Sequence, residues 1–351
     1  MSNSTFDGET VLVVGSGLLG TSVALGLTAQ GARVHLRDLD PENVTQAVGI
    51  GAGSSEPAVA PMLVVLAVPP SAVIEQARGV LAEFETAIVT DVTSVKSPLA
   101  REIDNQRFVG GHPMAGKERS GPLAASAKLF EGRPWAIVPH EGSGAEAVAL
   151  VEELAVALGA VRVHMTPELH DEAVALVSHV PHLVSNLTAG LLTGATDAHM
   201  VLAGQGLRDV TRIARSDTGL WVDIIGANAA PISDRLHELR DNLDELISIV
   251  DSDAANVERF LARGRAGTAN IPGKHGERPT DVVTVYVAID DEPGELARLL
   301  FDIGNVNVNI EDLRIEHEVG RPVGLIEVLV LPERADYLVD ALNSRGWTAY
   351  L

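Results

Sequence analysis

The chain has 351 residues, too many for one hydrophobic core of ordinary size, so two or three domains are expected. Its 48 acidic and 26 basic residues give a formal net charge of -22, which disfavours nucleic acid and anionic membranes as partners. The sequence has no cysteine, which excludes disulfides and thiol chemistry. It shows neither a signal peptide nor a bilayer-spanning apolar run, so the expected location is the cytoplasm.

Strand and helix patterns alternate over the first part of the chain. Residues 9–40 predict a buried strand, a glycine-rich turn, a helix that ends near Gly31 and a second strand that ends at Asp38. Further strands are expected at 61–69, 86–92, 107–111, 134–139 and 161–165, with helices among them at 71–84 and 144–159. This alternation predicts an α/β domain with a doubly wound parallel sheet over residues 1–165.

The glycine-rich turn carries the spacing G-x-G-x-x-G, formed by Gly15, Gly17 and Gly20. Between a strand and a helix, this motif is typical of Rossmann-type dinucleotide binding, because helix N-terminal amides receive the pyrophosphate. Asp38 follows the last glycine by 18 residues, where a carboxylate can accept hydrogen bonds from ribose hydroxyls. The residues expected to contact the dinucleotide are Gly15, Ser16, Gly17, Leu18, Leu19, Gly20, Asp38, Val68 and Pro69.

The charge at the end of the second strand bears on the choice of coenzyme. Asp38 would repel a 2′-phosphate, so NAD is favoured over NADP. Arg33 and Arg37 in the same strand keep NADP open as the alternative. A purely structural turn followed by a surface aspartate is the non-functional interpretation of the same motif.

His112 lies in the stretch GGHPMAGKERSG, directly after a predicted strand. We expect it on the loop that leaves the strand, at the carboxyl edge of the sheet, where substrates meet the coenzyme. An imidazole there could accept a hydroxyl proton, since its ordinary pKa suits a base near neutrality. The alternative is a histidine that caps or packs under the turn.

From residue 166 to 265 the pattern becomes helical, which predicts a substrate or dimerisation domain. His170, His179 and His182 lie on one run, and the last two share a helix face. No further metal ligands are evident, so no metal is expected, and substrate contact or buried hydrogen bonding is favoured. Pro181 should distort this helix.

Arginines gather in GLRDVTRIARSDTGLW, residues 206–221, within this acidic chain. A guanidinium keeps its charge and binds a carboxylate through two parallel bonds, so one of these residues could hold an anionic substrate. Pairing with neighbouring acidic side chains on the helix surface is the alternative for each of them.

The last part of the chain divides into a linker and a small module. Residues 266–279 are rich in glycine, proline and charged residues, as expected of a linker. Residues 280–351 predict strand, helix, strand, strand, helix and strand, which is a small α+β domain with βαββαβ order.

Taken together, these motifs resemble those of the prephenate and arogenate dehydrogenases of tyrosine biosynthesis. The resemblance runs from Val11 to about Phe260 and rests on VVGSGLLG, TDVTSVK, GGHPMAGKERSG, HDEAVALVSHVPHL and TRIARSDTGLW in that order. The segment DDEPGELARLLFDIGNVNVNIEDLRI separately resembles an ACT domain, an amino-acid-sensing module fused to some members.

The resemblance implies NAD-dependent oxidative decarboxylation, in which hydride passes to NAD, carbon dioxide leaves and the substrate ring becomes aromatic. His112 would take the proton of the ring hydroxyl, Ser94 would hydrogen-bond the same hydroxyl, and Arg212 would bind a substrate carboxylate. Further pocket residues implied by the resemblance are His179, His182, Asp209, Trp221 and Glu118. Prephenate is the favoured substrate, arogenate the alternative, and tyrosine the expected effector of the ACT-like module.

Other functions compete with this interpretation. A β-hydroxyacid dehydrogenase would need a catalytic lysine in the helical domain, and residues 166–265 contain no lysine. A non-catalytic sensor of NAD and amino acids would make the joint presence of its site residues a coincidence, namely Ser94, His112, His182 and Arg212. The last module could also serve only to dimerise, and the long apolar helices of residues 166–265 favour a homodimer.

Overall fold

The computed structural model describes residues 4–116, 119–251, 254–271, 281–317 and 323–351. The chain forms two compact units, residues 1–192 with 210–243, and residues 193–209 with 244–351. Within the described ranges no helix is long and apolar enough to cross a membrane. The domain boundaries expected at residues 165, 265 and 279 stay predictions.

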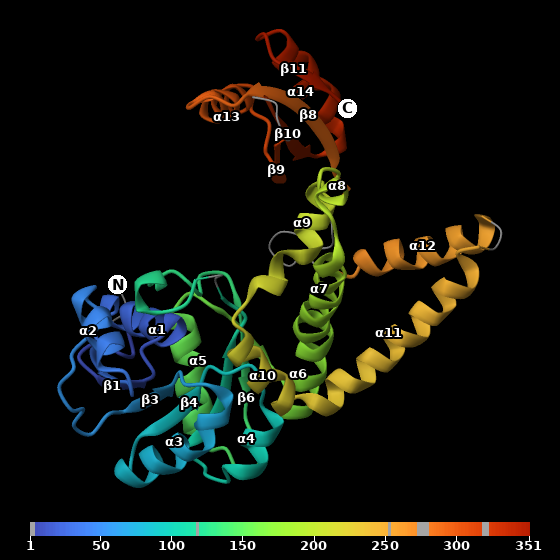
Figure 1. The fold of residues 1–351 in the computed structure, drawn as a ribbon. Helices are drawn as coiled ribbons and strands as arrows, with labels where there is room; N and C mark the ends of the chain where they lie inside the picture. Colours follow the sequence, from blue (N-terminus) through green and yellow to red (C-terminus); the bar gives the residue numbers. More distant parts are fainter. Residues whose placement is uncertain (1–3, 117–118, 252–253, 272–280, 318–322) are drawn as a thin grey trace. The chain divides into compact units, whose positions relative to one another are not determined.

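The first unit is built on a seven-stranded sheet of order β2-β1-β3-β4-β5-β6-β7 (Figure 1). Its strands are β1 (Thr10–Val14), β2 (Arg33–Arg37), β3 (Leu63–Leu66), β4 (Ile88–Asp91), β5 (Phe108–Pro113), β6 (Pro134–Val138) and β7 (Val161–His164). All seven lie where the apolar patterns predict strands, and the doubly wound α/β fold is confirmed.

The predicted parallel sheet has one antiparallel pairing that the sequence analysis did not anticipate. β5 and β6 pair antiparallel, with His112 opposite Ala136, whereas the other neighbouring strands pair in parallel. Between them the described residues form only the short 3₁₀ turn η1 (Pro122–Ala124), and antiparallel strands need no crossover helix. This pairing also places His112 inside β5, not on the loop after it.

Both faces of the sheet are covered by helices. Val11 and Val13 belong to one core with α1 (Leu18–Ala29) and α5 (Ala145–Ala157), whereas Leu12 and Val14 belong to the other with α3 (Pro70–Glu83) and α4 (Ser97–Glu102). Successive strand side chains point to opposite faces, so continuous apolar strands result from two-sided burial. Burying each such side chain stabilises the fold by about 1.5–3 kcal/mol. α2 (Pro41–Gly49) follows β2.

The remainder of this unit is helical. α6 (Pro167–Val174) begins where the Thr166 hydroxyl accepts a hydrogen bond from the Leu169 amide at 3.2 Å. A π-helical turn, η2 (Ala175–His179), joins it to α7 (Val180–Gly190). Pro181 has no N–H to continue the α-helical ladder, and the Val180 amide donates to Ala175, five residues back. The distortion expected from Pro181 therefore takes the form of a π turn.

The helical character of residues 166–265 is confirmed throughout its described part. After α7 come η3 (Leu191–Gly194), α8 (Asp197–Met200), α9 (Gln205–Thr211), η4 (Arg212–Arg215), α10 (Thr218–Ala227), α11 (Ala229–Ile249) and α12 (Ala254–Thr268). α12 continues to Thr268, so the first three residues of the expected linker are helical. Residues 272–279 of that linker lie outside the described residues.

The end of the second unit forms the expected βαββαβ module. Its elements are β8 (Val283–Asp290), α13 (Glu295–Asn305), β9 (Asp312–His317), β10 (Val323–Val330), α14 (Pro332–Asn343) and β11 (Thr348–Tyr350). The strands form an antiparallel sheet of order β11-β8-β10-β9. Val285 and Val287 of β8 share its core with Leu299 of α13 and Leu338 of α14, so the two helices complete the core of this module.

Candidate active site

The three glycines of the turn after β1 have different structural roles. Gly15 has φ +97°, and a Cβ atom there would lie 2.2 Å from the carbonyl oxygen of Ala67. A Cβ atom on Gly20 would lie 1.9 Å from the Gly15 carbonyl oxygen, whereas one on Gly17 would meet nothing within 4 Å. Gly15 and Gly20 are therefore required by backbone packing, and Gly17 leaves open space at the start of α1.

The surroundings of this space fit a dinucleotide. Gly17 is the N-cap of α1 and has no side chain to cap it, so the first helical turn, which contains Leu18 and Leu19, can face a phosphate. The buried Ser16 hydroxyl has no hydrogen-bond partner among the described residues. Asp38 accepts from the Ser16 amide at 2.5 Å and from the Asp40 amide at 2.8 Å, and each oxygen retains a second lone pair.

Val68 and Pro69 come from the segment that follows β3. This segment lies against the glycine turn, because Ala67 donates its amide to Val14 at 2.7 Å and its carbonyl approaches Gly15. Val68 is half-buried and Pro69 is exposed at the start of α3. The nine expected coenzyme residues thus come from three neighbouring segments at the carboxyl end of β1, β2 and β3.

Alanine substitutions separate the packing role from the binding role. Gly20→Ala is expected to destabilise the protein by about 1–3 kcal/mol, because the new methyl group overlaps backbone atoms. Gly17→Ala is expected to unfold near the wild-type temperature but to bind the dinucleotide more weakly, since its methyl group enters the open space. Thermal unfolding and titration with NAD check both, and a wild-type melting temperature for Gly20→Ala would contradict the close packing.

His112 is the start of a buried hydrogen-bond relay. It is 8% exposed, and its Nδ1 atom lies 2.9 Å from Nε2 of His170 in α6. Nδ1 of His170 lies 2.8 Å from Oδ1 of Asp171, the next residue along the helix. Asp171 also accepts the backbone amides of Lys96 and Ser97 at 2.8 Å each, which ties α6 to the start of α4.

The relay has a defined direction. Burial raises the pKa of Asp171, but hydrogen bonds from His170, Ser97 and Lys96 outweigh this effect and lower it below its ordinary value. An ionised carboxylate only accepts hydrogen bonds, so Nδ1 of His170 carries the proton and its Nε2 accepts from His112 Nδ1. This arrangement leaves Nε2 of His112 unprotonated and able to act as a base.

Electrostatics keep His112 neutral. Burial is the largest influence that lowers its pKa well below the ordinary value, followed by the positive charges that His170, Lys96 and His179 carry when they are protonated. Lys96 is itself buried and pairs with the equally buried Asp91, the last residue of β4. At neutral pH the imidazole is therefore available as a proton acceptor without first losing a proton.

Ser94 lies on the segment between β4 and α4, where it is half-buried. Asp91 ties this segment to β5, because its Oδ1 accepts the Gly111 amide at 3.2 Å and its Oδ2 accepts the Thr93 amide at 2.9 Å. Gly111 directly precedes His112, so the segment that carries Ser94 is held beside the strand that carries His112.

Two further histidines surround Trp221 of α10. The His182 ring stacks on the Trp221 ring with centroids 3.5 Å apart, and the His179 ring meets the same indole edge-on at 5.9 Å. Nδ1 of His179 accepts from Nδ2 of Asn228 at 3.0 Å, so its Nε2 carries the proton and can donate. Burial lowers the pKa of His179 to about 4 and lowers that of His182, so both rings are neutral at pH 7.

The other expected site residues are less closely joined to this cluster. Arg212 begins η4, which packs against α7, the helix that carries His182, and its side chain is exposed. Asp209 of α9 is exposed and accepts from Gln205 at 2.8 Å within the second unit. Glu118 lies outside the described residues.

The predicted absence of a metal stays a prediction.

Sequence reasoning singled out His170 as a histidine of the helical run but did not assign it to the site or link it to His112. It missed four further residues of the relay and its support, namely Asp171, Lys96, Asp91 and Asn228. The adjacent His-Asp pair at the start of α6 is the available signal for Asp171. A helical pattern does not show, however, that His170 meets a strand residue 58 positions earlier.

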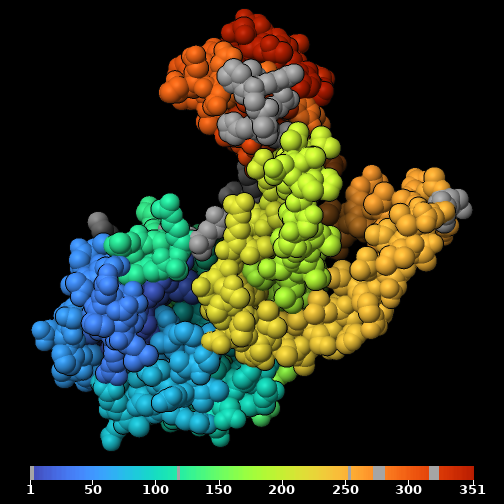
Figure 2. Space-filling view, viewed as in Figure 1, coloured from blue at the N-terminus to red at the C-terminus, as the bar shows by residue number. Residues whose placement is uncertain are grey.

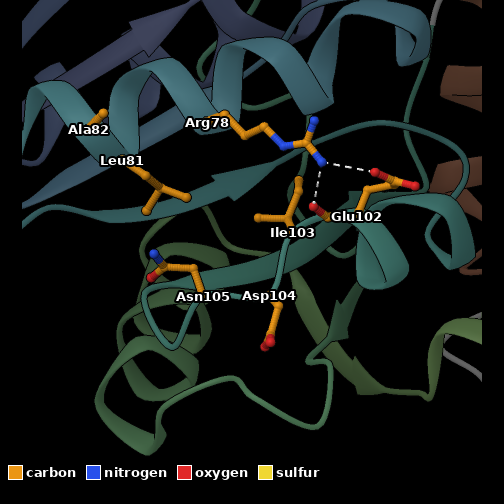
Figure 3. A pocket seen from close by; sticks show the side chains of 7 residues that line it. All are labelled: Arg78, Leu81, Ala82, Glu102, Ile103, Asp104 and Asn105. Atoms are coloured by element: carbon orange, nitrogen blue, oxygen red, sulfur yellow. Dashed lines mark hydrogen bonds and ion pairs between the residues drawn. The ribbon is translucent and has the colours of Figure 1, made fainter.

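A hollow of about 350 Å³ lies elsewhere on the first unit, between α3 and α4 (Figure 3). It is lined by Arg78, Leu81, Ala82, Glu102, Ile103, Asp104 and Asn105. Arg78 donates to both the carbonyl and the carboxylate of Glu102 at 3.0 and 2.8 Å. The segment from Ile103 to Asn105 leads into the amino end of β5, opposite the edge expected to bind substrate, so the hollow is not part of the candidate site.

Two family models match the chain, the nucleotide-binding domain of prephenate dehydrogenase over residues 23–164 and its dimerization domain over residues 166–263. This chain belongs to the prephenate dehydrogenase family. A probable prephenate dehydrogenase of Streptomyces niveus, NovF, is 34% identical, with 97% of this chain and 99% of the relative covered. The prephenate dehydrogenase of Bacillus subtilis is 29% identical, with 88% of each chain covered.

Solved structures of the prephenate dehydrogenase family agree with this assignment. Aquifex aeolicus prephenate dehydrogenase, in complex with hydroxyphenyl propionate and NAD+, matches with a TM-score of 0.69 and 30% identity, over 75% of this chain and 98% of that chain. Synechocystis arogenate dehydrogenase matches with a TM-score of 0.64 and 26% identity, over 74% of this chain and 98% of that chain. The resemblance in the motifs is therefore confirmed at the level of the family.

Proposed function

We propose that this protein catalyses the NAD-dependent oxidative decarboxylation of prephenate to 4-hydroxyphenylpyruvate. The observation that carries the proposal is the relay from Asp171 through His170 to His112, which leaves a neutral imidazole nitrogen free to accept a proton. The glycine turn and Asp38 supply a fitting dinucleotide site on the same sheet, and membership in the family supplies the reaction class.

The chemistry follows from the groups present. NAD, when bound, supplies the acceptor for the hydride that leaves the ring carbon bearing the hydroxyl. His112 Nε2 takes the proton of that hydroxyl as the carbon is oxidised, and Ser94 hydrogen-bonds the same oxygen. The ring carboxylate then leaves as carbon dioxide, its bonding electrons make the ring aromatic, and the imidazolium returns its proton to the phenolate oxygen.

Substrate carboxylates need fixed donors and a permanent cation. Arg212 would bind one of them through its guanidinium, and the neutral His179 would donate from Nε2, because Asn228 fixes its tautomer. His182 and Trp221 would form an apolar wall beside the ring, with Asp209 and Glu118 as further pocket residues by family resemblance.

Arg212→Ala is expected mainly to raise KM for prephenate. Loss of a charge-assisted contact costs about 2–4 kcal/mol, which corresponds to a rise of about 30- to 900-fold. Steady-state kinetics with varied prephenate check this effect, with NAD affinity as the internal control. An unchanged KM would assign the substrate-binding cation to another residue.

Arogenate is the alternative substrate, because it differs from prephenate by an amino group in place of the side-chain keto group. The Synechocystis match shows that arogenate dehydrogenases share this fold. Measuring NADH or NADPH formation with each substrate and each coenzyme tests the proposal directly. No reduction of NAD with either substrate would contradict it, and reduction with arogenate alone would favour the alternative.

We also propose that the C-terminal module binds tyrosine and that the enzyme is feedback-regulated. The βαββαβ order and the sheet order β11-β8-β10-β9 support an ACT-like domain. Deleting residues 280–351 is expected to abolish inhibition by tyrosine while catalysis remains, with phenylalanine as the control ligand. Retained inhibition in the shortened chain would contradict this role, and loss of dimerisation alone would favour a plain association module.

A homodimer formed through the helical part is the proposed assembly. Only Ile232 is buried among the described residues of α11, and none is buried in α12. Figure 2 shows these helices in yellow to orange. Exposed apolar side chains on these helices and on α7 include Leu187, Leu243, Ile247 and Leu261. Sedimentation equilibrium tests this assembly, and a monomer at micromolar concentration would contradict it.

The cytoplasmic location stays a prediction.

A further inference from the structure

Two arginines of β2 could in principle bind the 2′-phosphate that distinguishes NADP from NAD. Arg37 ends the strand and directly precedes Asp38, whose carboxylate accepts the amide of the glycine turn. Arg33 begins the strand, about 13 Å from Arg37 at 3.3 Å per residue, and donates to Thr10 Oγ1 at 3.3 Å. Arg37 is therefore the arginine of this strand that directly adjoins Asp38 in the chain.

Arg37 is held by an acidic partner from α3. Its Nη1 and Nη2 atoms donate to the two carboxylate oxygens of Glu83 at 2.8 and 2.7 Å. These two parallel hydrogen bonds occupy guanidinium N–H groups of Arg37 that would otherwise be available to bind a phosphate. The hydrogen bond from Arg37 lowers the pKa of Glu83, so this carboxylate is charged at neutral pH.

We propose that Glu83 is a specificity-determining residue for the coenzyme: it holds Arg37 and so withholds from NADP the cation that a 2′-phosphate requires. Glu83 acts as a positioning residue through Arg37, and its effect adds to the charge repulsion by Asp38. This inference rests on the NAD dependence proposed above. Because the two side chains are 41% and 44% exposed, the pair contributes little to folding stability, and a variant at position 83 should fold.

The test compares NAD and NADP binding in matched variants of the full chain. Glu83→Gln removes the charge that holds Arg37, and Arg37→Gln combined with Glu83→Gln removes the released cation as well. Glu102→Gln is the control, because it removes an equal charge from another exposed pair, Arg78 with Glu102, whose N–O distance is 2.8 Å. Calorimetric titration with NAD and with NADP gives both dissociation constants without any substrate.

Glu83→Gln is expected to tighten NADP binding about fivefold to tenfold, with NAD affinity within about twofold of wild type. The double variant and Glu102→Gln are expected to bind NADP as the wild type does. Unchanged NADP affinity in Glu83→Gln would overturn the inference, as would an equal gain in the double variant or in Glu102→Gln. A wild type that binds no NAD would contradict the proposed function as well, so the two failures are distinguishable.

Discussion

His112→Asn is expected to lower kcat about 10²- to 10⁴-fold while NAD affinity stays within about twofold of wild type. Asparagine keeps a small polar side chain at this position of β5, but it has no nitrogen that can take up a proton. The buried cluster of His112, His170 and Asp171 therefore stays polar while the base is lost. Single-turnover measurements of NADH formation, together with NAD titration, separate the chemical step from coenzyme binding.

The pH profile of the wild type provides an independent check of the same role. Burial and neighbouring positive charge lower the pKa of His112 well below that of an ordinary histidine, so the base is protonated only at low pH. We expect kcat/KM to show no decline in the pH range where an ordinary histidine takes up a proton, and to fall only in more acidic solution. For the variant of the preceding paragraph, a wild-type kcat in His112→Asn would show that His112 is not the catalytic base.

His170→Leu is expected to lower kcat about 10²-fold, with a smaller effect on NAD affinity. Leucine has a similar volume, but it neither accepts the proton of His112 Nδ1 nor bonds Asp171, so the tautomer of the base is no longer fixed. His170 is also one of the groups that lower the pKa of His112. The acidic decline of kcat/KM should therefore move to higher pH in the variant.

The matched control for this substitution is His164→Leu. His164 is 53% exposed and lies 3.1 Å from Glu152, outside the relay, so kcat should stay at the wild-type level. Thermal unfolding of both variants shows whether the buried substitution affects folding. A folded His170→Leu enzyme with wild-type kcat and an unchanged pH profile would contradict the relay.

Local patterns predicted the elements of this protein well, for physical reasons. The apolar runs at β1, β3 and β4 are buried on both faces, and Gly15 and Gly20 occupy positions that a Cβ atom could not share with neighbouring backbone. Such features depend on neighbours in sequence or on one tight contact. The direction of β6 could not be predicted in the same way, because a strand pattern is the same in both directions.

The site was predicted in part, and the missing part is the set of contacts between distant segments. His112, His179 and His182 stood out in the sequence as candidate site histidines, but the partner that orients each one did not. Asn228 reaches His179 from 49 positions away, and Lys96 offers its backbone amide to Asp171, which no residue-type pattern reveals. The role of Arg37 likewise changes only once its bond to Glu83 is seen.

The position of His112 inside β5, and not on the loop after it, has a consequence for turnover. Its neighbours are fixed by the antiparallel pairing with β6 and by the Asp91 carboxylate on the Gly111 amide. In the proposed role, a base that lies within a paired strand is already in place before substrate arrives and loses little freedom in the transition state. The motions that admit prephenate and release product should then come from the helical wall, where Trp221 and Arg212 reside, and not from the base itself.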